Sequence, residues 1–291
     1  MRRSLGLILV GLMFAGCAPP ADPPTDPGYP PPLPTSWTLQ HTVLTSDRIH
    51  LAGQRIGRFE QSTTLVVDAA KDQPADRCSV DVSNTGYGGA ERWVGEQIPT
   101  TVRGRPALRN GAGAEGPYLT WQDDGGRWVA VQCEQEAVMP VVADRVRTDR
   151  TAKVTIPFGV TAAAGYTESS LDVERDPVRV VVALDPPDHN PDFSLDVSLD
   201  RSEPGELPTG EPTTVSGRPG LVTRNPKFPR VCVLARPTPA AYVCVDITPD
   251  DTGPYPDRTD VIPVLESIAA SLTFADLDDP STWFDADRAL G

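Results

Sequence analysis

The sequence has 291 residues, with 40 acidic side chains against 26 lysines and arginines, and a formal net charge of −14. This charge argues against nucleic acid as a partner, because phosphate backbones are bound by clustered cations. It also predicts repulsion from anionic phospholipid.

The N-terminus has the three zones of an export signal. Arg2 and Arg3 precede the apolar stretch 5–14, and Ala15-Gly16-Cys17 follows. Small residues directly before a cysteine resemble the lipobox of bacterial lipoproteins, although Phe14 replaces the usual leucine. The resemblance implies a signal peptide at 1–16, a lipid on Cys17 and a location on the extracytoplasmic face of the cell membrane. The alternative is an ordinary secretory signal in which Cys17 is incidental.

Residues 17–36 are rich in proline and have little to bury, which predicts an extended tether of about 3 Å per residue. Removing residues 1–16 takes away two arginines, so 26 − 2 = 24 basic residues face 40 acidic ones and the formal charge becomes −16. Lysine occurs only at positions 71, 153 and 227, a bias typical of high-GC bacteria such as actinobacteria.

An internal repeat organises the rest of the chain. Ser79–Ser83 recurs at Ser194–Ser198, at an offset of 115, and Pro99–Pro106 recurs at Pro212–Pro219 with seven of eight residues identical, at an offset of 113. Met139-Pro140-Val141 also matches Ile262-Pro263-Val264. We therefore expect repeat domains at 37–150 and 151–276, followed by a tail at 277–291.

Each copy contains five β-branched or alternating runs that predict strands. In the first copy they are 64–68, 78–83, 101–108, 118–122 and 127–132, and in the second 179–184, 193–199, 214–222, 231–235 and 241–247. Asp123-Asp124-Gly125-Gly126 predicts a hairpin turn between the last two strands of the first copy. A helix should close each copy; in the second, Asp260 is the expected cap, and Ile262, Leu265, Ala269 and Leu272 form its apolar stripe.

The predicted fold class is α+β, with two tandem antiparallel β-sheet domains, each with a C-terminal helix packed on the sheet. The Gly-Arg-Pro strand followed by the hairpin between Trp121 and Trp128 is similar to repeated domains of unknown function, and the arrangement resembles small actinobacterial lipoproteins with a PsbP-like sheet and helix. The second copy has no tryptophan in the matching hairpin, so different duties for the two copies stay open. In the tail, we expect Trp283 and Phe284 to cover the edge of the second core rather than to anchor a partner.

Four further cysteines are expected to form disulfides, because an even number is typical of an exported protein. Cys133 and Cys244 fall on matching strands of the two copies. We favour pairing within each copy, Cys78 with Cys133 and Cys232 with Cys244, although a Cys133–Cys244 bridge between the copies is possible. No Cys-x-x-Cys spacing points to a metal or redox role.

Candidates for catalysis are few. His41, His50 and His189 lie in no recognisable motif, and His41 alternates with Leu39 and Val43 as an exposed strand residue would. Gly111–Gly116 matches the Gly-x-Gly-x-x-Gly pattern of dinucleotide sites, but Pro117 and a strand follow where a helix would have to begin. We interpret these glycines as a hairpin loop.

Two acidic groups could bind calcium, namely Asp185, Asp188 and Asp192, and Asp250, Asp251 and Asp257. Prolines interrupt both, so solvated turns are favoured, and no metal site or cofactor is predicted.

The favoured function is that of a membrane-anchored, non-catalytic binding or cell-envelope protein with an unknown envelope partner or ligand. The alternatives are a carrier that holds a lipid or other apolar ligand between sheet and helix, and an uncharacterised hydrolase.

Overall fold

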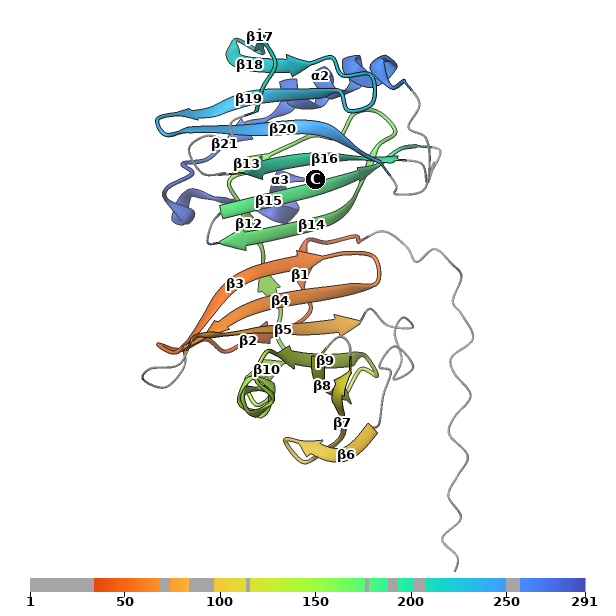
Figure 1. Ribbon diagram of the computed structural model, residues 1–291, viewed down its shortest axis with the longest axis vertical. Coiled ribbons are helices and arrows are strands. Elements are labelled where there is room, and N and C mark those ends of the chain that lie inside the picture. Colours follow the sequence, from red (N-terminus) through yellow and green to blue (C-terminus); the bar gives the residue numbers. More distant parts are fainter. Residues whose placement is uncertain are drawn as a thin grey trace, which may run out of the picture.

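A single antiparallel sheet of fourteen strands dominates the computed structural model of the protein (Figure 1). The structure describes residues 34–68, 74–83, 97–113, 116–175, 178–187, 193–200, 208–249 and 257–290. Across the sheet the strands follow the order β17-β18-β19-β20-β16-β15-β14-β3-β4-β5-β9-β8-β7-β6. None of the described helices is long and apolar enough to span a membrane.

The first copy supplies seven strands of this sheet and four short strands beside it. Its elements are β1 (Thr38–Leu39), β2 (Thr42–Val43), β3 (Ile49–Ile56), β4 (Glu60–Val67), β5 (Asp76–Ser83), β6 (Gln97–Val102), β7 (Arg105–Gly113), β8 (Gly116–Gln122), β9 (Trp128–Cys133), the 3-10 turn η2 (Glu136–Val138), α1 (Met139–Ala143), β10 (Val146–Arg147) and β11 (Ala152–Lys153).

The second copy repeats this order. Its elements are β12 (Thr155–Ile156), β13 (Phe158–Gly159), β14 (Thr167–Arg175), β15 (Val178–Asp185), β16 (Phe193–Asp200), β17 (Glu211–Val215), β18 (Arg218–Thr223), β19 (Arg230–Pro237), β20 (Ala240–Pro249), η3 (Thr259–Val261), α2 (Ile262–Ser271), β21 (Thr273–Phe274), η4 (Pro280–Thr282), β22 (Phe284–Asp285) and α3 (Ala286–Ala289).

Every strand of the first copy corresponds to the strand eleven places later. The half-sheet β3-β4-β5-β9-β8-β7-β6 matches β14-β15-β16-β20-β19-β18-β17, and the short pairs β1–β11 and β2–β10 match β12–β22 and β13–β21. This correspondence ends the first copy at β11. It also places β22, from the segment 277–291, within the second copy.

The predicted α+β class of two separate sheet-and-helix domains is wrong. The protein is mostly β. The outer strands β3 and β14 of the two half-sheets pair with each other, so the two copies share one continuous sheet. The helices are short. α1 has five residues and contacts β8 and β9, and α2 has ten residues and contacts β17, β19 and β20.

The start of α2 also differs from the expectation. Asp260 lies within η3, and α2 begins at Ile262 without a side-chain cap. Pro263 occupies the first turn, where its missing N–H costs no helical hydrogen bond. The buried face of α2 consists of Ile262, Leu265, Ile268 and Ala269, and Leu272 is buried just after the helix.

The strongest sequence repeat forms a tight hairpin in each copy rather than the single strand expected. Arg103-Gly104 joins β6 to β7, with φ of 50° and 78°, and Ser216-Gly217 joins β17 to β18, with φ of 48° and 78°. Two consecutive residues with positive φ make the primed turn whose twist matches that of the paired strands. Glycine at the second position makes this turn accessible.

Two hydrophobic cores lie against the half-sheets. The larger is built mainly from the second copy and includes Trp37 and Leu39 from the start of the described chain, while the smaller belongs to the first copy. Alternation explains the packing: on β15 the side chains of Val180, Val182 and Leu184 are buried, and each such residue stabilises the fold by roughly 1.5–3 kcal/mol.

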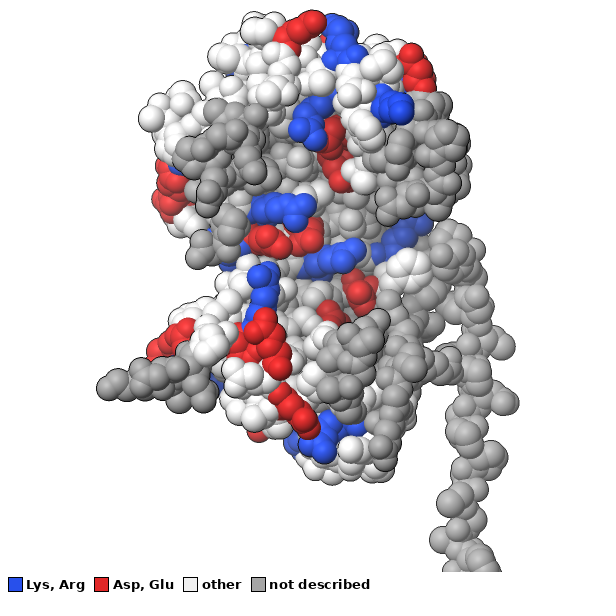
Figure 2. Space-filling view, viewed as in Figure 1, with Lys and Arg blue, Asp and Glu red and all other residues white. Residues whose placement is uncertain are grey.

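Charged side chains occupy the surface where the half-sheets meet (Figure 2). Arg55 on β3 lies opposite Asp172 on β14. Burial raises the pKa of Asp172, while the charges of Arg55 and Arg179 act in the opposite direction. The β3–β14 seam therefore places an arginine opposite a partly buried aspartate.

The two ends of the described chain meet behind the sheet. The carboxylate of Asp287 in α3 accepts hydrogen bonds from the Ser36 hydroxyl, the Trp37 backbone N–H and the Thr38 hydroxyl. Trp37 is buried in the larger core. The point where the proline-rich N-terminal segment enters the fold is thus fastened to the C-terminal helix.

One disulfide lies within each copy. Cys78 on β5 is bonded to Cys133 on β9, and Cys232 on β19 is bonded to Cys244 on β20. These are the pairings that the sequence analysis favoured. Cys133 and Cys244 occupy matching strands, but their partners lie on opposite sides of that strand in the sheet order.

We expect the two disulfides to contribute unequally to stability. The Cys78–Cys133 bridge spans 55 residues and the Cys232–Cys244 bridge spans 12. Loop-closure entropy then predicts losses of about 4 and about 3 kcal/mol in the free energy of unfolding when each pair is replaced by alanine. Urea unfolding followed by tryptophan fluorescence measures both. A larger loss for the Cys232→Ala/Cys244→Ala protein would contradict the entropic explanation.

Candidate functional site

Several residues singled out in the sequence lie outside the described residues. These are Cys17 and the tether up to residue 33, His189, and the acidic residues Asp188, Asp192, Asp250 and Asp251. Of the two acidic groups, Asp185 forms an ion pair with Arg58, and Asp257 accepts hydrogen bonds from Thr259. Both described members therefore have structural partners.

His41 is fully buried, so the expectation of an exposed strand residue is wrong. Its Nε2 lies 3.0 Å from the Thr63 hydroxyl, and its Nδ1 has no hydrogen-bond partner among the described residues. Arg127 extends over this region and donates to the carbonyl oxygens of Gln40 and Thr148. Burial, and secondarily the charge of Arg127, lowers the pKa of His41 to about 4.

His50 is far more exposed, and its Nε2 lies 3.0 Å from a carboxylate oxygen of Asp68. His41 contacts a hydroxyl and His50 contacts an exposed carboxylate, so the described residues place these two histidines in different surroundings.

The glycine-rich string forms a hairpin, as interpreted. Gly113 at the end of β7 pairs with Gly116 at the start of β8. The chain runs from strand to strand, so there is no helix N-terminus to face a pyrophosphate. Ala114 and Glu115 lie outside the described residues.

A metal site at the first disulfide is excluded by its chemistry. Asp76, Cys78 and Cys133 offer three potential ligand atoms within 4.8 Å of one another. The two sulfurs are bonded to each other, however, so neither is available as the thiolate that would bind a metal. The Asp76 carboxylate instead accepts the backbone N–H of Gln135.

The tail aromatics fold back onto the second copy. Trp283 is buried and donates its indole N–H to the Asp276 carbonyl oxygen, and Phe284 belongs to β22, which pairs with β12. Both residues have structural roles there.

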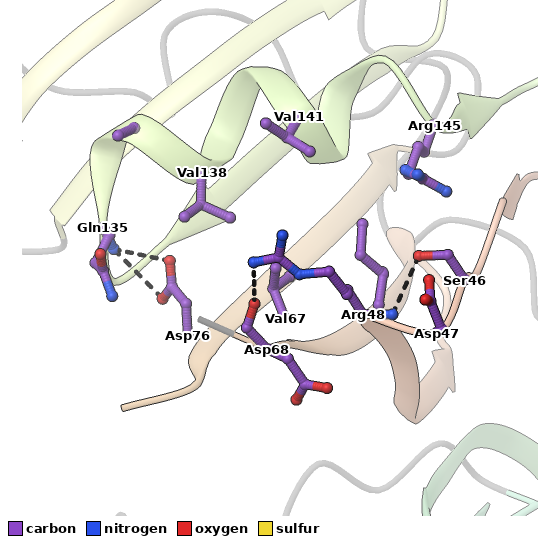
Figure 3. Close-up of a pocket in the computed structure, with 12 residues that line it drawn as sticks. Ser46, Asp47, Arg48, Val67, Asp68, Asp76, Gln135, Val138, Val141 and Arg145 are labelled. Carbon is purple, nitrogen blue, oxygen red and sulfur yellow. Dashed lines mark hydrogen bonds between the residues drawn. The ribbon is translucent and has the colours of Figure 1, made fainter. Parts of the chain in front are cut away.

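Two concave surfaces lie beside α1. A hollow of about 330 Å³ lies between α1 and the ends of β3 and β4 (Figure 3). Ile49 and Val67 contribute apolar surface from the sheet, and Val138 and Val141 face them from the helical segment. We call this the Arg48 hollow, after the side chain that extends into its centre.

Two guanidinium groups line the Arg48 hollow. Arg48 donates to the backbone oxygen of Asp68, and Arg145 donates to the backbone oxygen of Leu44. Within the described part of the chain, neither has a carboxylate at ion-pairing distance. Arginine side chains held by carbonyls keep donors available for a carboxylate or phosphate.

A second hollow, of about 310 Å³, lies on the other side of α1. Met139, Pro140 and Leu119 line it together with Ile98 of the edge strand β6, and we call it the Ile98 hollow. Pro99 and Thr100 also line a third hollow of about 630 Å³ on β6, β7 and β8, which contains Trp121 and Trp128. Trp121 belongs to the first core, so its packing role is established.

Exposed apolar side chains accompany these hollows. Val141 on α1 is 51% exposed, Ile98 is 40% exposed and Leu44, which follows β2, is 36% exposed. We refer to these three residues and the Arg48 and Ile98 hollows as the α1 surface. Clustered apolar exposure beside concave surface is typical of interaction sites.

The second copy has no such cluster at the matching positions. Val160, which matches Leu44, is 3% exposed, and Val264, which matches Val141, packs against the larger core. Glu211 replaces Ile98. Beneath α2, Leu265 and Ile268 are fully buried. The α1 surface therefore distinguishes the first copy from the second. Aligning the sequences of the two copies could have revealed only the replacement of Ile98, because the other matching residues are apolar in both.

Comparisons with known proteins assign no family to the chain. No protein-family model matches it, and no curated protein is similar to it. Two similar solved structures are MucB in complex with MucA(peri) and the Pseudomonas aeruginosa MucA/MucB complex. Each is 10% identical in sequence to this chain and matches it with a TM-score of 0.25. Each match covers 78% of this chain, and it covers 92% of the first MucB structure and 93% of the second. A TM-score of this size supports no argument about fold or function.

We expect His41 to make the protein less stable in mild acid. Its pKa is about 4 when folded and 6.5 when unfolded, so the unfolded state binds more protons between these values. The free energy of unfolding should fall by up to about 1.4 kcal/mol per pH unit as the pH drops from 6.5 towards 4. Urea unfolding at several pH values should show a smaller decline for His41→Gln.

His50→Gln serves as the control for loss of an exposed imidazole, and it should keep the decline. Burial raises the pKa of Asp196 and Asp246, which gives the opposite dependence on pH, but both variants retain these groups. If the free energy of unfolding of His41→Gln fell with pH as steeply as that of the unaltered protein, the decline could not be assigned to His41.

Proposed function

We propose that this protein is an extracytoplasmic binding protein, anchored by lipid on Cys17, that engages an envelope partner through the α1 surface of its first copy. One observation carries the proposal. The same element order occurs twice, yet apolar side chains beside open hollows are exposed at α1 and are buried, partly buried or replaced at the matching positions of the second copy.

The composition of the α1 surface supports the binding of a protein partner. Val141 lines the Arg48 hollow and Ile98 lines the Ile98 hollow, so apolar contacts are available beside α1 in both hollows. Arg48 and Arg145 provide hydrogen-bond donors in the first of these hollows. Apolar centres with arginine nearby are typical of protein interfaces.

A lipid carrier is less well supported. The Arg48 and Ile98 hollows lie beside α1 and are near the lower limit for a ligand pocket, and the larger third hollow lies on β6, β7 and β8 rather than between the sheet and a helix. The space between the sheet and α2, where an acyl chain would have to be held, is filled by Leu265 and Ile268. We therefore propose partner binding rather than transport.

The anchor predicts a change in location. Cys17→Ser removes the sulfur that would accept the lipid, so the variant should appear in the culture medium while the unaltered protein stays in the membrane fraction. Immunoblots of the two fractions measure this. Retention of Cys17→Ser in the membrane would refute the lipid anchor without affecting the α1 surface.

The α1 surface predicts position-specific cross-linking. A photoreactive phenylalanine derivative at Val141 should form a defined protein adduct in native membranes, identified by mass spectrometry. The same derivative at Val264 is the matched control, since this residue has the same place in α2 but packs against the core. Equal adducts at both positions, or none at Val141, would contradict the proposal.

A further inference from the structure

The second copy is closed by its C-terminal helix. α3 contacts β12, β13 and β22, and its Ala286 and the following Leu290 are buried in the larger core. The backbone N–H of Val160 donates to the Ala289 carbonyl oxygen at 3.0 Å. A Cβ on Gly159 would lie 3.3 Å from that same oxygen, so glycine allows the helix to approach β13 closely.

Among its described residues, the first copy has no equivalent of α3. After β11 the chain reaches β12 through Val154 alone, which leaves no residues to form a closing helix there. The consequence appears on β2. Thr42 and Val43 are only partly buried and Leu44 is exposed, whereas the matching Phe158, Gly159 and Val160 are all buried.

The groups beside this partly buried strand include two guanidinium groups without a carboxylate at ion-pairing distance among the described residues. Arg145 reaches Leu44 through a hydrogen bond to its carbonyl oxygen, and Arg48 lies in the adjoining hollow. Two of the three aspartates that line this hollow have other partners: Asp68 contacts His50, and Asp76 accepts the Gln135 N–H. Three carboxylates and two guanidinium groups therefore line the hollow, and the guanidinium groups, which donate to backbone oxygens, have further donors available for a carboxylate.

We infer that the α1 surface receives a short peptide segment of a partner protein, laid over β2 and Leu44 as α3 is laid over β13 and Val160. Small and apolar residues of the segment cover Leu44, and an acidic residue at its start reaches Arg48 or Arg145. The segment around α3 has this chemistry: Asp285 and Asp287 are followed by Ala289 and Leu290, and the two carboxylates contact Lys153 and Ser36–Thr38. This inference rests on the proposed function and specifies the partner.

The test uses α3 as a probe for the surface that it does not cover. A fluorescein-labelled peptide of residues 280–290, Pro-Ser-Thr-Trp-Phe-Asp-Ala-Asp-Arg-Ala-Leu, is titrated with the full-length protein and followed by fluorescence anisotropy. The chain's own α3 occupies the site on the second copy at a high effective concentration. Saturable binding should therefore report on the first copy.

Two substitutions define the expected result. Leu44→Asp should raise the Kd by about tenfold or more, because it places a carboxylate where the apolar residues of the peptide dock. Ala270→Asp, an equal charge change at an exposed position on α2, should leave the Kd within about twofold. A peptide with both aspartates replaced by asparagine should bind more weakly. In 0.5 M NaCl the difference in Kd between the two peptides should shrink, because the Debye length falls to about 4 Å and the charges are screened from one another.

Circular dichroism establishes that each variant is folded, and Val141→Asp replaces Leu44→Asp if the latter is not. Absence of saturable binding, or binding that is indifferent to Leu44→Asp and Val141→Asp, would overturn the inference. These outcomes are distinct from failure of the proposed function. A defined adduct at Val141 without binding of the peptide would leave partner binding intact and refute docking in the manner of α3.

Discussion

The pairing of β3 with β14 is the contact on which the architecture depends. Four residue pairs, from Ile56 opposite Leu171 to Gly53 opposite Glu174, join two seven-stranded halves into one sheet. A Cβ on Gly53 would lie 3.1 Å from the Val173 carbonyl oxygen, so the strands meet where a side chain would crowd the backbone. The sheet stops at β6 and β17, which carry Pro99 and Pro212 at matching positions, and proline blunts a sheet edge because it lacks an N–H donor.

Duplication with a continuous sheet makes the two copies unequal. The second copy is followed by α3, which covers β13 and fastens Ser36–Thr38 through Asp287. The first copy is followed at once by the second and has no residues for such a cover. The exposure of Leu44 is therefore a consequence of chain order, and a surface left open in this way is available to a partner.

Local patterns predicted much of the secondary structure. The Asp123–Gly126 hairpin and the helix that contains Pro263 in its first turn formed where turn chemistry and apolar spacing placed them. β3 and β14 escaped prediction because each has a register shift, at Leu51/Gly53 and Glu168/Ser170, and a bulge breaks the alternation by which a strand is recognised. The Gly-Arg-Pro repeat was interpreted as one strand because positive φ at Arg103 and Ser216 is uncommon outside glycine, asparagine and aspartate.

By itself, the sequence determined the duplication, the order of most strands, the proline-rich segment behind Cys17 and a short list of cysteine pairings, because each depends on residues close together in the chain or on similarity between two segments. The tertiary structure decided that the half-sheets fuse, that His41 is buried, and that α3 covers one copy while the α1 surface of the other stays open. These features depend on which edges and faces meet in space, and such contacts join residues as far apart as Trp37 and Asp287.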